Sequence, residues 1–205
     1  MNNLPFAQPY HVTYDMQTPY HVCAGLQDNN TWCGPSAVRT NTGIINDHWY
    51  VISGGDGFQP LMDPNNPRIV YGTSQDGRMS RIDRLTNERT TLRPEPEEGE
   101  TAYRWNWDTA MTMSPHDPRT IYVGANRLFR STDRGQTWEA ISPDLTTNPN
   151  RATFSIMGVT DPNILIARND GVTTWGTLVT IAESPMRPGI LWTGSSMRRL
   201  RLTWW

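Results

Sequence analysis

The segment Pro118-Arg119-Thr120-Ile121-Tyr122-Val123-Gly124 carries the pattern that decides the fold, because four copies of it align along the chain without gaps. Each copy begins with proline, has an aliphatic residue fourth, continues with cysteine or an aromatic residue and ends on a small residue. Proline introduces turns, and aliphatic and aromatic side chains favour strands, so each copy predicts a turn that leads into a short strand. The other copies are Pro19-Tyr20-His21-Val22-Cys23-Ala24-Gly25, Pro67-Arg68-Ile69-Val70-Tyr71-Gly72-Thr73 and Pro188-Gly189-Ile190-Leu191-Trp192-Thr193-Gly194.

The spacing of these copies indicates the architecture. Their closing residues Gly25, Thr73, Gly124 and Gly194 lie 48, 51 and 70 positions apart. Periods of about 40 to 50 residues, each with several short strands, are typical of propeller blades. The longer third interval predicts an insertion between blades over about 146–176.

Within the third copy and its flanks, turn residues and apolar runs predict four strands, at 109–114, 120–124, 128–131 and 138–141. A single blade exposes two apolar faces and needs neighbours to cover them. The 205 residues hold about four blades, whereas closed propellers typically have about four to eight. We therefore predict an all-β fold over 1–205: a β-propeller fragment of about four blades, built from four-stranded antiparallel sheets and forming an incomplete ring.

Composition agrees with an all-β chain and excludes several partners. Apolar residues make up only 36%, whereas Gly and Pro number 16 each, so turns are frequent and long apolar runs are few. The formal charge is −2, which gives no broad electrostatic surface for nucleic acid or anionic membranes. No segment has the length and hydrophobicity of a membrane span, and the first residues lack the features of a signal peptide.

Cys23 and Cys33 are the only cysteines and do not form a zinc motif. We expect two unpaired thiols, with a disulfide across a hairpin as the alternative. The four histidines show no HExxH motif and no ligand-like pairing, so we predict no metal and no cofactor.

A second motif, Ser131-Thr132-Asp133-Arg134-Gly135-Gln136-Thr137-Trp138, fits the pattern SxDxGxTW at every fixed position. Asp133 is suited to accept backbone N–H groups inside a hairpin turn, and Gly135 to adopt a positive φ. Trp138 is suited to pack as an apolar plug between sheets. This pattern of Ser131, Asp133, Gly135, Thr137 and Trp138 predicts a structural role and says almost nothing about catalysis.

The chain resembles the BNR (bacterial neuraminidase repeat) or Asp-box propellers of the sortilin-N-terminal-like and glycosyl hydrolase-like family. The motif above is the Asp box, and the resemblance extends from residue 1 to about 194. In that family Asn2-Asn3-Leu4-Pro5 falls inside a propeller, which implies a fragment, and after Gly194 the sequence departs, which suggests truncation or a shifted reading frame. The segments that carry the resemblance are Gly25–Asn29, Trp32–Ser36, Gly54–Phe58, Tyr103–Trp107, Ser114–Pro118, Ile141–Thr146 and Ile181–Pro185.

The resemblance implies an extracytoplasmic protein and leaves two functions open. One is hydrolysis or binding of a polysaccharide, and the other is a non-catalytic, sortilin-like scaffold that binds peptides or proteins. The implied partners are a carbohydrate or peptide ligand and the missing blades of a longer parent chain. The fragment is expected to be inactive alone, and fold by itself does not choose between the two functions.

Candidate catalytic residues come from aspartates placed where turns gather at one end of the ring, namely Asp28, Asp56, Asp76 and Asp170. Glycoside hydrolysis uses two carboxylates about 5 to 9.5 Å apart, although Asp-Gly and Asp-Asn are also ordinary turn formers. Asp28 and Asp56 are the preferred candidates, followed by Asp108. The segment just before Asp108 supplies three candidate sugar-binding residues, Arg104, Trp105 and Trp107. Trp in a propeller is, however, more often part of the core.

Other mechanisms find less support. A sialidase site needs three arginines converging on a carboxylate, and the spacing of Arg39, Arg81 and Arg104 does not identify one. The sequence also has no GxSxG elbow for a serine nucleophile.

Overall fold

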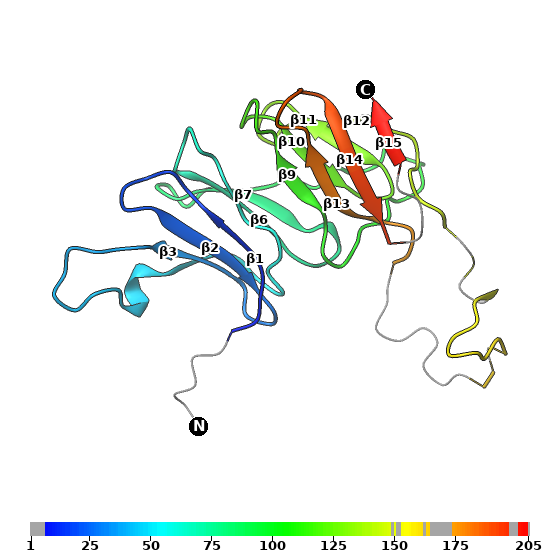
Figure 1. Ribbon diagram of the computed structural model, residues 1–205, viewed down its shortest axis with the longest axis horizontal. Helices are drawn as coiled ribbons and strands as arrows, with labels where there is room; N and C mark the ends of the chain where they lie inside the picture. Colours follow the sequence, from blue (N-terminus) through cyan, green and yellow to red (C-terminus); the bar gives the residue numbers. More distant parts are fainter. Residues whose placement is uncertain are drawn as a thin grey trace.

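The computed structural model describes residues 7–148, 150, 153–161, 163–164, 174–196 and 201–204, and within them the chain is built from four antiparallel sheets with no α-helix. Figure 1 shows the sheets following one another along the molecule in chain order. The first sheet contains β1 (Pro9–Tyr14), β2 (His21–Leu26), β3 (Thr31–Pro35) and β4 (Tyr50–Ser53). The second contains β5 (Leu61–Met62), β6 (Ile69–Thr73), β7 (Met79–Asp83) and β8 (Arg89–Thr91). The third contains β9 (Met111–Met113), β10 (Ile121–Gly124), β11 (Leu128–Ser131) and β12 (Glu139–Ala140). The fourth contains β13 (Leu178–Glu183), β14 (Ile190–Ser195) and β15 (Arg201–Trp204).

Each sheet is a meander in which consecutive strands pair. The four repeated segments lie in β2, β6, β10 and β14, so each supplies the second strand of its sheet. The four strands predicted in the third copy are confirmed, and β11 has the predicted bounds. The fourth sheet has three strands within the described part of the chain, whereas the other three sheets have the predicted four. Two short 3-10 helices, η1 (Asn46–His48) and η2 (Gln75–Gly77), lie in loops.

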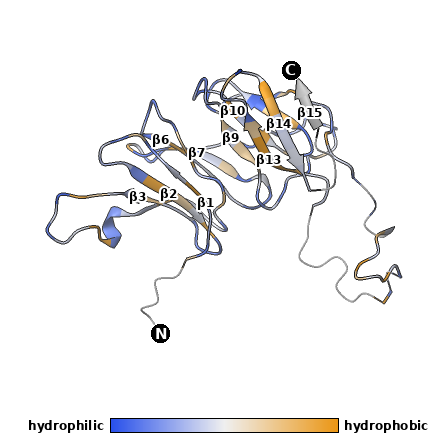
Figure 2. Cartoon of the chain, viewed as in Figure 1, coloured by the Kyte–Doolittle hydropathy of each residue, from blue (hydrophilic) through white to orange (hydrophobic). Residues whose placement is uncertain are grey.

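The core lies between neighbouring sheets. One cluster of buried side chains joins the second and third sheets and includes Tyr71, Met111 and Phe129, and a second, around Leu128 and Leu178, joins the third and fourth sheets. Figure 2 shows hydrophobic residues on the strands and mostly hydrophilic residues in the connecting loops. Burial of apolar surface stabilises the fold by about 25 cal/mol per Å². Here that surface is buried between neighbouring sheets, so no sheet has a complete core of its own.

Strand direction divides the loops into two groups. The turns between second and third strands lie at one end of the sheets, together with the connections from one sheet to the next. We call this the connection end. The turns between first and second strands and between third and fourth strands lie at the opposite end.

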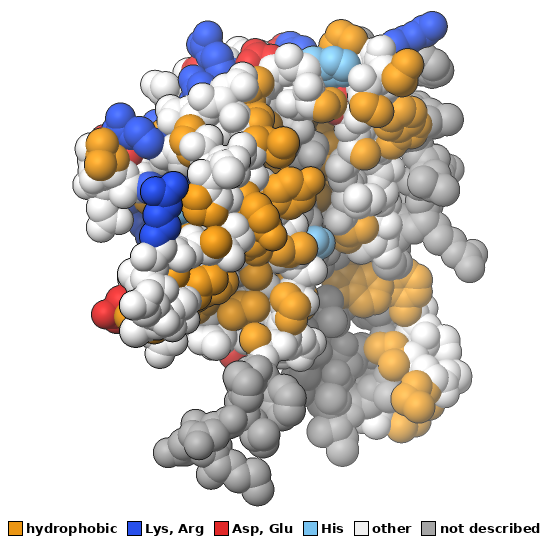
Figure 3. All heavy atoms as spheres, turned by 60° about the vertical axis from the view of Figure 1, so that its left-hand side comes forward, with side chains coloured by type: hydrophobic (Ala, Val, Ile, Leu, Met, Phe, Trp, Pro, Cys, Tyr) orange, Lys and Arg blue, Asp and Glu red, His pale blue; other side chains and the backbone are white. Residues whose placement is uncertain are grey.

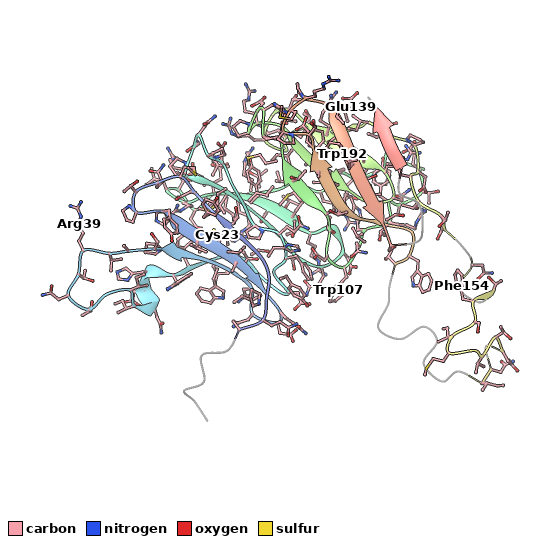
Figure 4. All side chains as sticks on the ribbon, viewed as in Figure 1. Cys23, Arg39, Trp107, Glu139, Phe154 and Trp192 are labelled. Atoms are coloured by element: carbon pink, nitrogen blue, oxygen red, sulfur yellow. A yellow bond between two sulfur atoms is a disulfide. The ribbon has the colours of Figure 1, made fainter. Side chains whose placement is uncertain are left out.

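Cys23 and Cys33 form a disulfide, so the expectation of two unpaired thiols is wrong. The two residues are register partners on β2 and β3, with Cα atoms 4.1 Å apart, and both are fully buried. Directly opposed residues in an antiparallel pair come this close in the positions without ladder hydrogen bonds. The disulfide therefore joins the two middle strands of the first sheet (Figure 4).

The outward face of the first sheet, away from the second sheet, carries many exposed apolar side chains. Val12, Tyr14 and Met16 are 68%, 65% and 72% exposed. Figure 3 brings this side of the molecule forward and shows a broad hydrophobic surface on it. Other large hydrophobic residues exposed in the first sheet or its loops include Tyr20, Trp49 and Val51. Within the described residues, no helix is long and apolar enough to cross a membrane.

Candidate functional site

Asp56 lies at the connection end, in the segment between β4 and β5, and only 6% of it is exposed. Its Oδ1 accepts the backbone N–H of Asp28 at 2.6 Å, from the turn between β2 and β3. Its Oδ2 accepts the indole N–H of Trp107 at 3.1 Å, from the connection between β8 and β9. This carboxylate therefore ties together segments that belong to the first three sheets.

A second carboxylate, Asp108, pairs with a histidine beside it. Asp108 Oδ2 is 3.0 Å from Nε2 of His11 at the start of β1, and this hydrogen bond raises the pKa of His11. The other oxygen of Asp108 is buried and has no hydrogen-bond partner among the described residues. The pKa of Tyr10 is raised by burial first, and then by the charges of Asp56, Asp28 and Asp108. The three carboxylates therefore lie near one phenol, whose ring packs against that of Phe58 at a tilt of 52°, with centroids 4.8 Å apart.

Glycines allow this convergence. A Cβ on Gly25 would lie 2.3 Å from the carbonyl oxygen of Phe58, and a Cβ on Gly57 would lie 2.5 Å from that of Asn30. The backbones of the β2–β3 turn and of the Asp56 segment can touch only because both positions lack a side chain. Backbone hydrogen bonds fix the contact, from Gly57 N–H to Leu26 O at 3.0 Å and from Asn30 N–H to Gly55 O at 2.9 Å.

The predicted aromatic and arginine residues separate into different roles. Trp107, which Figure 4 labels, is 47% exposed, and its indole N–H donates to the Asp56 carboxylate. Trp105 is 3% exposed and packs in the core, stacked on Phe129 with centroids 6.0 Å apart. The guanidinium of Arg104 is held by Asp144 Oδ2 at 2.7 Å, Thr146 Oγ1 at 2.9 Å and the carbonyl oxygen of Gly176 at 3.2 Å. Of the two tryptophans, only Trp107 has an exposed ring that a ligand could contact.

The region around Arg104 is a tight polar clamp between the third and fourth sheets. Partial burial would raise the pKa of Asp144, but hydrogen bonds from Thr146, Asn126 and Arg104 outweigh it and the pKa is lowered. The amide of Asn126 donates to Asp144 at 2.9 Å and its carbonyl oxygen accepts the backbone N–H of Arg104 at 3.0 Å. These hydrogen bonds hold Arg104 between the third and fourth sheets, and its prediction as a sugar-binding residue stays a prediction.

The Ser131–Trp138 turn lies at the opposite end of the sheets. Asp133 Oδ1 accepts Thr137 N–H at 2.9 Å and Ser131 O–H at 2.7 Å, and Oδ2 accepts the hydroxyl of Thr137 at 2.6 Å. Burial would raise the pKa of Asp133, but these hydrogen bonds lower it to about 2. Gly135 has a φ of +84°, and Trp138 packs against the core cluster between the second and third sheets. All the hydrogen-bond partners of Asp133 lie within four residues along the chain.

The candidates from the sequence thus come together in part. Asp28, Asp56, Asp108 and Trp107 converge, Asp76 occupies the turn of the second sheet equivalent to that of Asp28, and Asp170 lies outside the described residues. Tyr10 and His11 were missed, because His11 meets Asp108 across 97 residues and no motif marks either residue. No group of three or more His, Cys, Asp or Glu side chains suited to a metal ion occurs in the part of the chain that the structure describes.

The carboxylates near Tyr10 and Trp107 lie in different environments. Asp56 is buried and doubly hydrogen-bonded, whereas Asp28 is exposed at the same point of the surface. The imidazole of His11 is held beside Asp108 as a proton carrier. Carboxylates in unlike environments together with an aromatic ring are the groups that bind sugars and transfer protons to glycosidic oxygen.

Comparison with known proteins supports the fold. No protein-family model matches the sequence, and no curated protein matches it. Among solved structures, the chain is similar to the GH74 xyloglucanase from Xanthomonas campestris, with a TM-score of 0.53 and 12% identity over 90% of this chain and 26% of that one. It is also similar to the GH74 enzyme of Niastella koreensis, with a TM-score of 0.52 and 14% identity over 90% of this chain and 27% of that one.

A third similar structure is the Cps50 (Swd1) β-propeller domain of Myceliophteria thermophila, with a TM-score of 0.47, 11% identity and coverage of 93% of this chain and 51% of that one. The chain spans about a quarter of the length of each of the two GH74 chains. The similarity to the two GH74 structures concerns the fold, and with the four antiparallel sheets it indicates part of a β-propeller.

Proposed function

We propose that the chain is part of a BNR-repeat, glycosyl hydrolase-like propeller that binds or hydrolyses a polysaccharide at the connection end. The observation that carries the proposal is the convergence of Asp28, Asp56 and Asp108 beside the exposed ring of Trp107. An aromatic ring that projects beside carboxylates matches a sugar, which has an apolar ring face and hydroxyl edges. The similar fold of the GH74 xyloglucanase supports a polysaccharide in general as the ligand.

In this proposal Asp28 and Asp56 are the catalytic carboxylates, and Asp108 acts with His11 as a third polar group. Trp107 supplies the stacking surface, and Arg104 fixes the connection that carries it. Ser131, Asp133, Gly135, Thr137 and Trp138 form a structural Asp box. The disulfide between Cys23 and Cys33 supports an extracytoplasmic location, because disulfides persist in oxidising compartments.

Binding to soluble polysaccharides, measured by affinity electrophoresis, tests the proposal. The wild-type chain should be retarded by at least one polysaccharide, neutral or acidic, and Trp107→Ala should lose that retardation. Trp192→Ala is the matched control, because Trp192 is 42% exposed on β14, in a different sheet from the site (Figure 4). Equal retardation of the wild type and the Trp107→Ala variant would contradict the proposal.

The alternative is a non-catalytic, sortilin-like scaffold that binds peptides or proteins. One observation favours it: both oxygens of Asp56 already accept hydrogen bonds from the chain itself, as a structural carboxylate does. The scaffold predicts capture of peptides without release of reducing sugar. Asp28→Asn and Asp56→Asn in the longer parent protein distinguish the two functions. A hydrolase should lose turnover in these variants, whereas a scaffold shows no turnover in the wild type either.

We further propose that residues 1–205 form one partial propeller, with repeats at 19–25, 67–73, 118–124 and 188–194 and an insertion at about 146–176. Its partners include further propeller blades of a longer parent chain. The support is the exposed apolar face of the first sheet around Val12 and Tyr14, whereas the opposite face of that sheet is covered by the second sheet. Val12→Ser with Tyr14→Ser should reduce binding of a hydrophobic dye to this face, and unchanged dye binding would count against this arrangement.

A further inference from the structure

A cavity opens at the connection end, between the first and second sheets, and its charge is unlike that of the Asp56 site. Its volume is about 560 Å³, and it is lined by residues from β4, β7 and β8, from the segments after β4 and β8, and from the connection between β6 and β7, which carries Arg78. Three arginines, Arg78, Arg89 and Arg93, line it, against one carboxylate, Glu95. We call it the arginine cleft.

The arginines are held to different degrees. Arg89 donates from Nη1 to the carbonyl oxygen of Ile52 at 2.7 Å and to Ser80 Oγ at 3.2 Å, so it is anchored to both sheets. The guanidinium of Arg93 lies over the ring of Trp105, 5.5 Å from the centroid, and its Nε is 3.3 Å from Glu95 Oε1. Arg78 is exposed, and its guanidinium has no hydrogen bond or ion pair within the described residues. The cleft therefore carries an excess of positive charge, with donors that remain available.

The other lining groups suit an oxygen-rich ligand. The hydroxyls of Ser53, Ser74 and Ser80 line the cavity, and Gly54 and Gly55 bring backbone close to its wall. Gly54 and Gly55 directly precede Asp56, so one loop contributes to both the cleft and the carboxylate site. Guanidinium groups bind carboxylate and sulfate oxygens through paired N–H donors, and hydroxyls add neutral donors around them.

We infer that the arginine cleft is a subsite for an anionic group, a carboxylate or a sulfate ester, on a polysaccharide that also contacts the Asp56 site. This inference rests on the proposed polysaccharide function and specifies its substrate class as acidic. The arrangement separates two charges: Asp28, Asp56 and Asp108 lie near Tyr10 and His11 of β1, and the cationic cleft lies along β4, β7 and β8. A uniformly neutral polysaccharide would leave the arginines without a charged partner.

Calorimetric titration of the whole chain with three oligosaccharides of equal length tests the inference, one neutral, one uronic acid-based and one sulfated. The wild type should bind at least one of the two acidic oligosaccharides about tenfold more tightly than the neutral one, and the preference should shrink at high salt because exposed charges are screened. The two acidic ligands show which anionic group the cleft selects. Arg78→Ala should remove most of the preference, and Arg78→Glu should abolish it.

Arg119→Ala is the matched control, because Arg119 is an exposed arginine at the opposite end of the sheets and is absent from the cleft lining. It should leave the affinity for the acidic ligands unchanged. If the neutral ligand binds as tightly as both acidic ligands, the acidic subsite is wrong and polysaccharide binding stands. If the preference survives in both Arg78 variants, the cleft is not its source and the inference is overturned. If no oligosaccharide binds, the proposed function fails and the subsite fails with it.

Discussion

Asp133 and Asp56 each accept several hydrogen bonds, but the donors to Asp133 are close in sequence and the donors to Asp56 are distant. Asp133 receives its partners from Ser131 and Thr137, inside a single hairpin, and lies at one end of the sheets. Asp56 receives its partners from Asp28 and Trp107, which are 28 and 51 residues away, and lies at the other end. A local motif builds the first carboxylate site, and the packing of three sheets builds the second. The Asp133 turn should therefore tolerate changes elsewhere, whereas the Asp56 site should depend on the whole arrangement.

The largest expected effect on stability comes from substituting one glycine in each region, Gly25 near Asp56 and Gly135 near Asp133. Gly25→Ala places a Cβ 2.3 Å from a backbone carbonyl of the Asp56 segment, which cannot rotate away, so the free energy of unfolding should fall by about 3 kcal/mol. In Gly135→Ala the near atoms belong to the flexible side chain of Leu92 at 2.9 Å, and the main penalty is the positive φ, about 1 to 2 kcal/mol.

Urea unfolding of both glycine variants measures the difference. Gly25→Ala should also abolish polysaccharide binding, whereas Gly135→Ala should keep it. Equal losses of stability in the two variants would remove the distinction between a site made by packing and a site made by a turn.

The disulfide gives the second test. Replacing both Cys23 and Cys33 by alanine should lower the free energy of unfolding by between about 2 and 3 kcal/mol, because the unfolded chain regains the entropy that a short closed loop removes. The disulfide supports the strands that carry Asp28, so the indole N–H resonance of Trp107 should shift in the NMR spectrum. The amide resonance of Thr137 is the internal control and should stay in place. A shift at Thr137 without one at Trp107 would reverse the expected dependence.

The repeat around Pro118–Gly124 was sufficient to predict the sheets, because strand periodicity and turn residues are local properties of the chain. The geometry around Asp133 was predictable for the same reason. The pairing of Cys23 with Cys33 was not predicted from ten-residue spacing, although the reason is visible afterwards. The β2–β3 turn is centred on Asp28, which has a φ of +55°, and this places the two cysteines opposite each other.

The candidate site was predictable only in outline. Turn position indicated that Asp28 and Asp56 lie at one end, and the structure brings them into contact through a backbone N–H group. Tyr10 and His11 depend on the packing of β1 against a connection almost a hundred residues later, which no local pattern encodes. Trp105 and Trp107 are two residues apart and would share a face in a regular strand, yet one is core and the other exposed, because the chain bends at Trp107.

A pair of isosteric substitutions should separate stability from function. Asn offers one acceptor oxygen in place of two, so Asp133→Asn and Asp56→Asn should each lower the free energy of unfolding by about 1 to 2 kcal/mol. Only Asp56→Asn should weaken polysaccharide binding, because only Asp56 lies in the proposed site. Urea unfolding and affinity electrophoresis measure the two effects. Loss of binding in Asp133→Asn but not in Asp56→Asn would place the ligand at the end opposite the connection end and contradict the proposed site.

The smallest effect concerns pH, and its sign differs between the two regions. The pKa of Asp133 is lowered to about 2 from its ordinary value of 3.8, so its hydrogen bonds stabilise the fold above about pH 4 and are lost as the pH falls toward 2. The pKa of His11 is raised from 6.5 by its hydrogen bond to Asp108, so that contribution is complete below pH 6.5 and is lost as the pH rises through the higher folded value. NMR titration of both side chains measures the two transitions. Asp133→Asn should remove only the acid transition and His11→Gln only the transition above pH 6.5, and the survival of either transition in its own variant would show that another group controls it.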